Sequence, residues 1–280
     1  MPHFIVTADT GSGQSEQYKV ANSIEKLTHK YPIHSVLLLG DNIYEEGVSS
    51  VDDVQFKTKF EDPYKNIQKP FYLCLGNHDY GNSLFLKSNS DHQVEYSKHS
   101  KKWNMPSKYY SFSKGPCEFF FIDTNLDVMN ESSIMNQLNH MIKLIRKSKK
   151  KWKILCGHHP WRSVGGHGNA DRRLEAFFNE LASKCKFDLY MCGHDHCKNI
   201  ILKKFGNRII TLLVIGTGGK EYHGNEDGKP QLRNMTENES DLLFHSPNLG
   251  TCHIIVTRRI LKLVCYNEEL KEEFTHVIRK

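Results

Sequence analysis

The residues best suited to chemistry lie where apolar segments of the chain end. Five such ends carry side chains that bind metal ions, in the stretches "ADTG", "GDNIY", "GNHD", "GHHP" and "GHDH". In α/β proteins, ligand sites gather where strands run out into loops. If these segments are neighbouring strands, their ends converge on one pocket. The candidate ligands are Asp9, Asp41, Tyr44, Asn77, His158, His194 and His196.

The donor atoms of this set suit two hard or borderline cations. Aspartate and asparagine offer oxygen, and histidine offers nitrogen. A glycine precedes the key residue in four of the five motifs, which lets the backbone turn sharply and leaves space beside the site. One such motif alone is a weak signal. All five, in this order and each after an apolar run, indicate a metal site.

The apolar runs that position these residues have the composition of β-strands, being rich in β-branched and aromatic residues. We expect strands at 3–8, 35–40, 70–76, 109–113, 117–123, 152–158, 187–194 and 209–216, and a hairpin within 250–267. Their near-continuous apolarity predicts sheets covered on both faces. Helices are expected around 14–30, 51–60, 131–148 and 171–184, with an apolar face in the third of them. The polar segment 216–248 is expected to be a long surface loop.

Composition places the chain among ordinary globular proteins. Its 280 residues are 38% hydrophobic and 25% charged, enough for a substantial core. Without an internal repeat or a clear linker, we expect one domain over 1–280, and a monomer. The net charge of +6 favours anionic ligands but does not imply nucleic acid. We interpret the run "RKSKKKWK" (146–153) as a solvated cationic helix end rather than a nucleic-acid patch.

The N-terminal stretch "MPHFIVTADTGSG" has no basic segment, no long apolar segment and no small-residue cleavage site. As written, the chain is expected in the cytoplasm and away from membranes; with a trimmed N-terminus, it would be secreted or lysosomal. The eight cysteines are expected to be buried free thiols in a reducing compartment. Cys192 and Cys197 flank "GHDH", but no second cysteine pair follows them, which argues against a zinc knuckle.

The order of the five motifs resembles that of the calcineurin-like metallophosphoesterase superfamily. Most members open with D-x-H, whose histidine binds the first metal, whereas this chain has Asp9-Thr10-Gly11. The purple acid phosphatases of the small tartrate-resistant type share this omission. They supply a tyrosine three residues after the bridging aspartate, as Tyr44 follows Asp41 here. The resemblance runs over nearly the whole chain and is weak at 220–248.

This resemblance implies two metals and a fold. Asp9, Asp41, Tyr44 and His196 would hold Fe(III), with Tyr44 as a phenolate whose charge-transfer band colours the protein. Asp41, Asn77, His158 and His194 would hold a divalent Fe, Zn or Mn ion, and Asp41 would bridge the two metals. The implied fold is α/β: a four-layer αββα sandwich of two mixed β-sheets flanked by helices.

The implied activity is that of an acid phosphatase on small-molecule or protein phosphomonoesters. Two metals ~3.5–4 Å apart position the ester and lower the pKa of a water, whose hydroxide attacks phosphorus in line. His78 and His167 match the family's two non-ligand histidines, and either could bind the phosphoryl group or protonate the leaving oxygen. Asp79 and Asp195 are expected to support the site. His159 is left out, because in a strand-like end it would point away from His158.

Three other functions stay open at this point. A phosphodiesterase or nucleotide hydrolase could use the same metals. A non-catalytic scaffold with this fold is less favoured, because degenerate relatives typically lose ligands and this chain has all seven. A nucleic-acid module is the weakest alternative, since it rests only on mild basicity and one lysine run.

Overall fold

The computed structural model describes residues 1–81, 89–222, 224, 228–235 and 240–280, and its strands form two seven-stranded sheets. In spatial order, the first sheet contains β14 (Glu272–Arg279), β13 (Ile260–Asn267), β12 (Gly250–Val256), β1 (His3–Thr7), β2 (Ile33–Leu39), β3 (Phe71–Cys74) and β4 (Trp103–Asn104). The second contains β11 (Ser240–Ser246), β9 (Lys198–Phe205), β10 (Arg208–Ile215), β8 (Leu189–Cys192), β7 (Trp152–Cys156), β6 (Cys117–Phe121) and β5 (Tyr110–Lys114).

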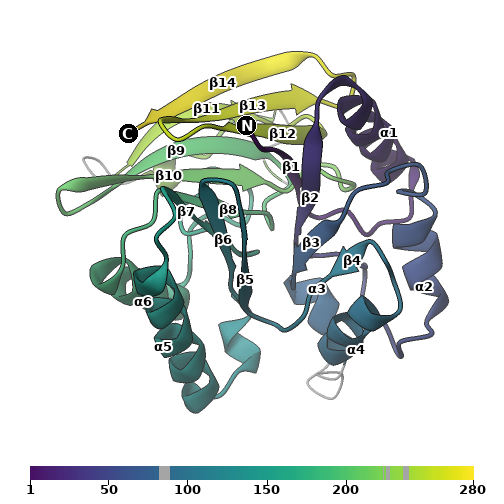
Figure 1. The fold of residues 1–280 in the computed structure, drawn as a ribbon, viewed down its shortest axis with the longest axis horizontal. Helices are drawn as coiled ribbons and strands as arrows, with labels where there is room; N and C mark the ends of the chain where they lie inside the picture. Colours follow the sequence, from purple (N-terminus) through teal and green to yellow (C-terminus); the bar gives the residue numbers. More distant parts are fainter. Residues whose placement is uncertain (82–88, 223, 225–227, 236–239) are drawn as a thin grey trace.

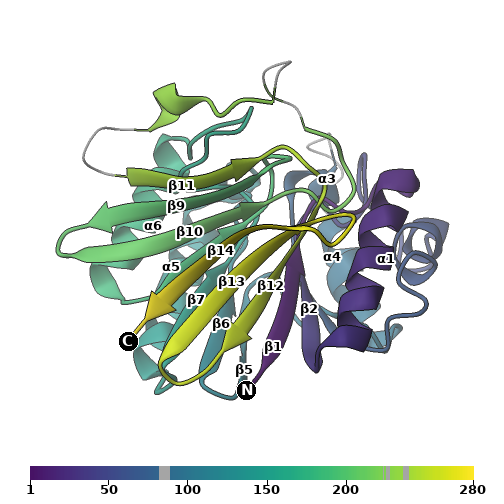
Figure 2. The same ribbon diagram turned by 90° about the horizontal axis from the view of Figure 1, so that it is seen from above.

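Helices flank the two sheets on their outer sides (Figures 1 and 2). Beside the first sheet lie α1 (Ser15–Lys30), α2 (Val54–Phe56), α3 (Asn77–Tyr80) and α4 (Asn89–Glu95). The second sheet is covered by α5 (Glu131–Lys147) and α6 (Arg172–Lys184). Both sheets mix parallel and antiparallel pairs, as β1 shows by pairing parallel with β2 and antiparallel with β12. The predicted four-layer αββα sandwich is confirmed.

The core lies between the sheets and beneath the two helices of the second sheet. The rings of Phe4 in β1 and Phe119 in β6 meet edge to face across the sandwich, with centroids 4.7 Å apart. In α5 the predicted apolar face is buried at Ile134, Leu138, Met141 and Ile145, as the 3.6-residue period requires. Side-chain caps fix where both covering helices begin: Asn130 accepts from the Ser133 N–H, and Asp171 accepts from the Leu174 N–H.

Some elements differ from the sequence-based expectation. The strands β9 and β14 were not expected, because polar and charged residues interrupt their apolar runs. The predicted surface loop contains β11, which pairs with β9, so the loop prediction is wrong for 240–246; residues 223, 225–227 and 236–239 lie outside the described residues. The helix expected at 51–60 begins only at Val54, where Asp53 caps it, and continues as a π-helical turn over Lys57–Glu61.

Among the described residues, no helix combines the length and the apolar composition that crossing a membrane would require. All eight cysteines are free thiols and buried, as expected.

A buried histidine pair on two inner strands of the first sheet, β1 and β12, makes stability depend on pH. His3 Nδ1 lies 2.9 Å from His253 Nε2, and both side chains are buried. Burial lowers the pKa of His253 to about 4, with further contributions from His3, Lys262 and Lys30. Between pH 6.5 and 4 the unfolded chain therefore binds more protons at this position than the folded one. Stability should fall as the pH drops through that window.

We expect the urea midpoint to fall between pH 7.5 and pH 5, and to fall less in His253→Gln, which keeps a polar contact to His3 without gaining charge. His29→Gln is the matched control, because His29 is an exposed histidine on α1. Its pH dependence should equal that of the unmodified chain. An unchanged pH dependence in His253→Gln would contradict this assignment.

Candidate metal centre

The five predicted strand ends meet at one edge of the sandwich. Because β1, β2 and β3 run parallel, the residues that follow them, Asp9, Asp41 and Asn77, emerge on the same side of the first sheet. In the second sheet β7 and β8 run parallel and deliver His158, His194 and His196. The structure therefore brings all seven predicted ligands together from both sheets.

The first cluster is built around the hydroxyl of Tyr44. This oxygen lies 3.1 Å from Asp9 Oδ1 and 3.2 Å from His196 Nε2. His196 Nε2 is 3.4 Å from the same Asp9 oxygen. All three side chains are buried, so a phenol, a carboxylate and an imidazole converge on one point.

The second cluster is built around the amide oxygen of Asn77. Asn77 Oδ1 lies 3.2 Å from His158 Nε2 and 3.0 Å from His194 Nδ1. His158 Nε2 is also 3.4 Å from Asp41 Oδ2. Ligand atoms of Asp9, Asp41 and His158 all lie within 4.8 Å of one another, which places Asp41 between the two clusters. Oxygen and nitrogen donors in this arrangement fit two cations that share one carboxylate.

Hydrogen bonds outside the clusters orient two of the histidines. His158 Nδ1 lies 2.8 Å from the Leu39 carbonyl oxygen, and His196 Nδ1 lies 3.0 Å from the Glu221 carbonyl oxygen. A carbonyl oxygen only accepts, so each Nδ1 carries the proton and donates it. Nε2 is therefore the nitrogen that faces the cluster, and it would offer its lone pair to a cation that displaces its proton.

At three of the candidate ligands, the backbone adopts an energetically unfavourable left-handed conformation. Asp9, Asp41 and His194 have φ values of 58°, 51° and 68°, in the left-handed region that side chains other than glycine rarely adopt. The predicted role of the preceding glycines is clear at Gly76, where an added Cβ would lie 2.1 Å from Asp41 Oδ1. Only a residue without Cβ allows this carboxylate its position.

Two further aspartates hold the loops that carry the clusters, as expected. The buried Asp79 accepts from Gly76 N at 2.8 Å and from Asn42 N at 3.0 Å, so it joins the loop after β3 to the loop after β2. Asp195 Oδ1 accepts from His167 N at 2.6 Å and fixes the loop that carries this histidine. Burial, and then the Asp41 charge, raise the pKa of Asp79 to about 6.

The electrostatics of the clusters oppose ionisation of the tyrosine. Burial, together with the Asp41 and Asp9 carboxylates, raises the pKa of Tyr44 well above its usual value. Burial disfavours the charged form of His158, but Asp41 outweighs it and raises the pKa of this histidine to about 10. Without a cation, the protons held by Tyr44 and His158 therefore offset the negative charge of the carboxylates in the site. A bound cation would oppose these effects and favour the phenolate form of Tyr44.

A pocket of about 250 Å³ opens onto the clusters and is lined by His78, His167, Glu45 and Lys220 as well as by predicted ligands. The two predicted catalytic histidines thus lie at the site, although neither belongs to a cluster. Lys220 was not anticipated from the sequence. Its Nζ lies 2.7 Å from Glu45 Oε1 and 4.3 Å from the centre of the Tyr44 ring.

The expectation that His159 points away from the site is wrong. Its ring centre lies 4.5 Å from that of His194, and its ligand atom is within 4.8 Å of those of His158 and His194. The strand β7 ends at Cys156, so the alternation of side chains along a strand no longer applies at this residue. His159 Nδ1 contacts Thr124 Oγ1 at 2.8 Å, and the residue lines a second pocket together with Asn77.

Comparisons with known proteins agree with this geometry. The sequence model described as calcineurin-like phosphoesterase matches residues 2–198. "Purple acid phosphatase 4" of Arabidopsis thaliana is 31% identical over 94% of this chain and 79% of its own length. Among solved structures, GAP50, described as the anchor in the inner membrane complex of Plasmodium, superposes with a TM-score of 0.79 at 21% identity, covering 99% of this chain and 88% of its own. The yellow lupin purple acid phosphatase PPD1 superposes with a TM-score of 0.73 at 16% identity, covering 99% of this chain and 53% of its own.

Proposed function

Because the chain belongs to the calcineurin-like phosphoesterase family and, within it, to the purple acid phosphatases, we propose that its two clusters each hold one metal ion. The chain is a metal-dependent phosphoester hydrolase. In the proposed assignment Fe(III) takes the cluster of Asp9, Tyr44 and His196, and a divalent Fe, Zn or Mn ion takes the cluster of Asn77, His158 and His194, with Asp41 shared by both.

The chemistry of the first cluster supports a trivalent ion. Burial and two carboxylates raise the pKa of this phenol, and a bound cation of higher charge favours its ionised form more strongly. A phenolate is also a hard, strongly donating ligand that suits Fe(III) better than a softer divalent ion. The second cluster offers two imidazole nitrogens and one amide oxygen, and this set suits a divalent ion.

We further propose phosphomonoesters as substrates, at acidic to neutral pH. Two ions held there would bind the phosphoryl oxygens and lower the pKa of a bound water. His78 Nδ1 lies 2.6 Å from the Glu45 carbonyl oxygen and donates to it, so Nε2 is the nitrogen left to contact substrate. His167 packs with its ring centre 4.2 Å from that of His194. These positions suit a proton donor to the leaving oxygen and a hydrogen-bond donor to the phosphoryl group.

The observation that carries the proposal is the convergence of seven donor side chains from five strand ends, with neighbouring ligand atoms 3.0–3.4 Å apart. Its test is hydrolysis of p-nitrophenyl phosphate by the metal-loaded protein across acidic to neutral pH. We expect turnover of this monoester, and of phosphopeptides, at rates well above those of bis-p-nitrophenyl phosphate and ATP. A preference for the diester would make the chain a phosphodiesterase, and stoichiometric metal without any turnover would favour a scaffold.

The ion pair at the pocket mouth should control substrate affinity. In Lys220→Met the Glu45 carboxylate would face the pocket without its partner and repel a phosphate dianion. We expect KM for p-nitrophenyl phosphate to rise about tenfold, equivalent to about 1.4 kcal/mol, with a smaller change in kcat. Steady-state kinetics with the metal-loaded protein provide the measurement.

The matched controls are Glu45→Gln and the double variant. Removing the carboxylate alone should leave KM unchanged or lower it, and adding Glu45→Gln to Lys220→Met should restore most of the lost affinity. If Lys220→Met keeps the original KM, the ion pair does not act on the substrate.

We also infer that residues 1–280 form one domain. Strands that follow the matched family region enter both sheets: β9 and β10 pair beside β8, while β12 pairs with β1. Neither sheet would be complete without them. The solved structure described as an anchor shares this fold, but all seven ligand types are present in this chain, which supports catalysis.

A further inference from the structure

Another pocket, of about 580 Å³ and separate from those at the metal centre, is lined mostly by cationic side chains. It is formed by Gly115, Pro116, Lys149, Lys150, Lys151, Arg258, Arg259 and Lys280, and is called the cationic pocket below. Lys149, Lys150 and Lys151 belong to the lysine run that we interpreted from the sequence as a solvated helix end. Arg258 and Arg259 come from the turn between β12 and β13, more than a hundred residues away along the chain. No carboxylate side chain is among its lining residues.

The cationic pocket is built where the two sheets meet. Trp152 Nε1, at the start of β7 in the second sheet, donates to the Thr257 carbonyl oxygen in the first sheet at 2.7 Å. The backbone N–H of Lys280 donates to the Arg259 carbonyl oxygen at 3.0 Å, and Lys280 Nζ donates to the Lys151 carbonyl oxygen at 2.6 Å. Two of these bonds cross between the sheets and the third lies within the first sheet, and together they fix three segments around the pocket.

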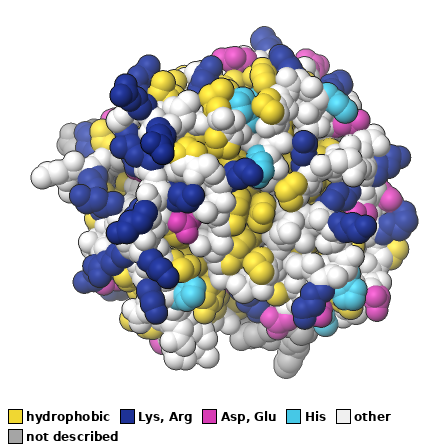
Figure 3. Space-filling view, viewed as in Figure 1, with side chains coloured by type: hydrophobic (Ala, Val, Ile, Leu, Met, Phe, Trp, Pro, Cys, Tyr) yellow, Lys and Arg dark blue, Asp and Glu magenta, His cyan; other side chains and the backbone are white. Residues whose placement is uncertain are grey.

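Most of its charges are uncompensated. Lys280 pairs with Asp188, at 2.5 Å, and Lys150 donates to the Gly115 carbonyl oxygen at 3.0 Å. For Lys149, Lys151, Arg258 and Arg259, all exposed, the described part of the chain offers no carboxylate within ion-pair distance. Like charges that share one concavity raise the local positive potential and attract anions. In Figure 3, Lys and Arg side chains gather on the side of the molecule where Figure 1 shows the C-terminus.

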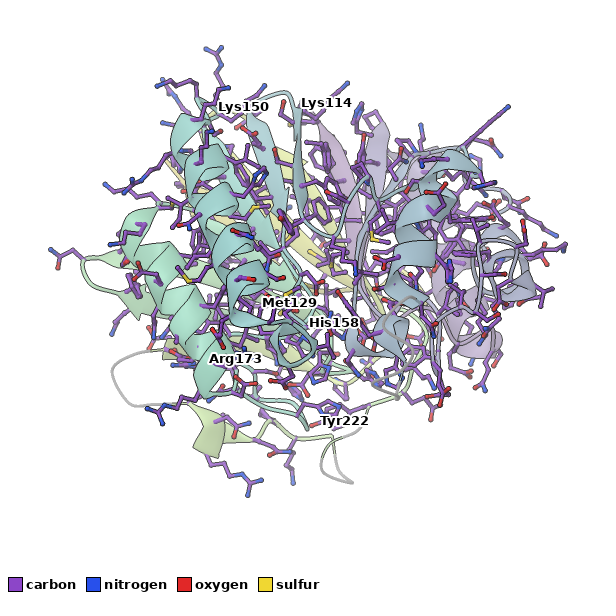
Figure 4. All side chains as sticks on the ribbon, turned by 90° about the horizontal axis from the view of Figure 1, so that it is seen from below. Lys114, Met129, Lys150, His158, Arg173 and Tyr222 are labelled. Atoms are coloured by element: carbon purple, nitrogen blue, oxygen red, sulfur yellow. The ribbon has the colours of Figure 1, made fainter. Side chains whose placement is uncertain are left out.

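The cationic pocket lies at the end of the sandwich opposite to the metal centre. Lys151 immediately precedes β7, and His158 follows the same strand. Six residues, five of them in β7, lie between the two, which corresponds to roughly 20 Å. In Figure 4, Lys150 and Lys114 lie at one end of the molecule and His158 lies toward the other. A phosphate ester bound at the metal centre therefore does not occupy the cationic pocket.

We propose that the cationic pocket is a second anion site, which binds a compact ligand carrying several phosphate groups. A single phosphate would neutralise only part of the charge. The pocket is concave and within the size range of small-molecule sites, so it suits a compact polyanion better than a flat surface or an extended nucleic-acid strand. Arginine and lysine together supply bidentate and point-charge contacts to phosphate oxygens. The ligand can be free in solution or the headgroup of a lipid.

The test is calorimetric titration of the metal-loaded protein with inositol hexakisphosphate, with orthophosphate present throughout to occupy the metal centre. We expect one ligand per chain, and affinity that falls steeply as salt increases. The variant Lys149→Gln/Lys151→Gln/Arg258→Gln/Arg259→Gln should weaken binding at least about thirtyfold, equivalent to about 2 kcal/mol. Its turnover of p-nitrophenyl phosphate should not change, because none of the four residues lies near the metal centre.

A matched control removes the same charge elsewhere. The substitutions Lys26→Gln/Lys65→Gln/Lys101→Gln/Lys186→Gln neutralise four exposed lysines that do not line the cationic pocket. We expect this control to bind inositol hexakisphosphate within about twofold of the unmodified chain. An equal loss in both variants would overturn the proposal, because net charge alone would then explain binding.

Vesicles distinguish the two sources of the ligand. Vesicles of phosphatidylcholine with phosphatidylinositol bisphosphate test a lipid headgroup, and vesicles of the same charge with phosphatidylserine test a plain anionic surface. Binding of inositol hexakisphosphate supports the site. Additional capture by the bisphosphate vesicles alone would assign a headgroup, and no capture would assign a free ligand. Binding to both vesicle types, or to an oligonucleotide, without binding of inositol hexakisphosphate would overturn the proposal.

Discussion

Asp41→Asn should lower kcat/KM for p-nitrophenyl phosphate by roughly a thousandfold or more, equivalent to about 4 kcal/mol of transition-state stabilisation. Asp41 lies between the two clusters, and its Oδ2 is 3.4 Å from His158 Nε2. Asparagine keeps the shape of the side chain but removes the negative charge that two cations would share. We therefore expect the metal content, measured by elemental analysis, to fall for both ions.

The matched control for this prediction is Asp52→Asn, at an exposed aspartate outside the clusters. It should keep full metal content and activity. Circular dichroism separates loss of metal from loss of fold, since Asp41 Oδ1 also accepts from the His78 N–H at 3.0 Å. A folded Asp41→Asn protein with two metals and normal turnover would contradict the shared-ligand assignment.

Tyr44→Phe should abolish the visible absorption of the iron-loaded protein. The hydroxyl of Tyr44 is the atom that meets Asp9 and His196, so phenylalanine preserves the buried ring while deleting the proposed phenolate ligand. A purple or pink band in the unmodified protein, absent in the variant, would assign the colour to this residue. Iron affinity should fall as well, because Asp9, Asp41 and His196 remain as the only proposed protein ligands of that ion.

Tyr64→Phe is the control for the spectrum. Tyr64 is another fully buried tyrosine, but it belongs to neither cluster, so its variant should keep the band. A band that persists in Tyr44→Phe would exclude this tyrosine as its source. Colourless unmodified protein with two Zn or Mn ions would refute the Fe(III) assignment while leaving phosphoester hydrolysis in place.

Much of the candidate site could be predicted because its chemistry is local in the sequence. Each metal-binding motif follows an apolar run, and the end of a parallel strand places its side chains at a known edge of the sheet. Asp9, Asp41 and Asn77 therefore met as the motif order indicated, and so did His158, His194 and His196. The residue types and order of the motifs also carried the family resemblance, and through it the four-layer fold.

Other features depended on contacts that no local pattern encodes. The alternation rule misplaced His159, because β7 ends before it and the loop turns its ring toward His194. Lys220 contacts Glu45 from a segment 175 residues away, so the sequence near either residue does not predict the ion pair. The strands β9 and β14 have apolar runs interrupted by polar and charged residues, and they pair with neighbouring strands that present backbone groups to them.

The sequence by itself determined which side chains are the candidate metal ligands and the order in which the strands deliver them, because both follow from residue types at short spacing. The sequence also contains the lysine run at 146–153, but it does not show which distant residues lie beside that run. Only the tertiary structure decided that this run meets Arg258, Arg259 and Lys280 in one pocket, at the opposite end from the metal centre. The physical reason is that antiparallel pairing of β12 with β1 and β13 returns a distant turn to the start of β7, and such long-range pairing is set by packing of the whole sandwich.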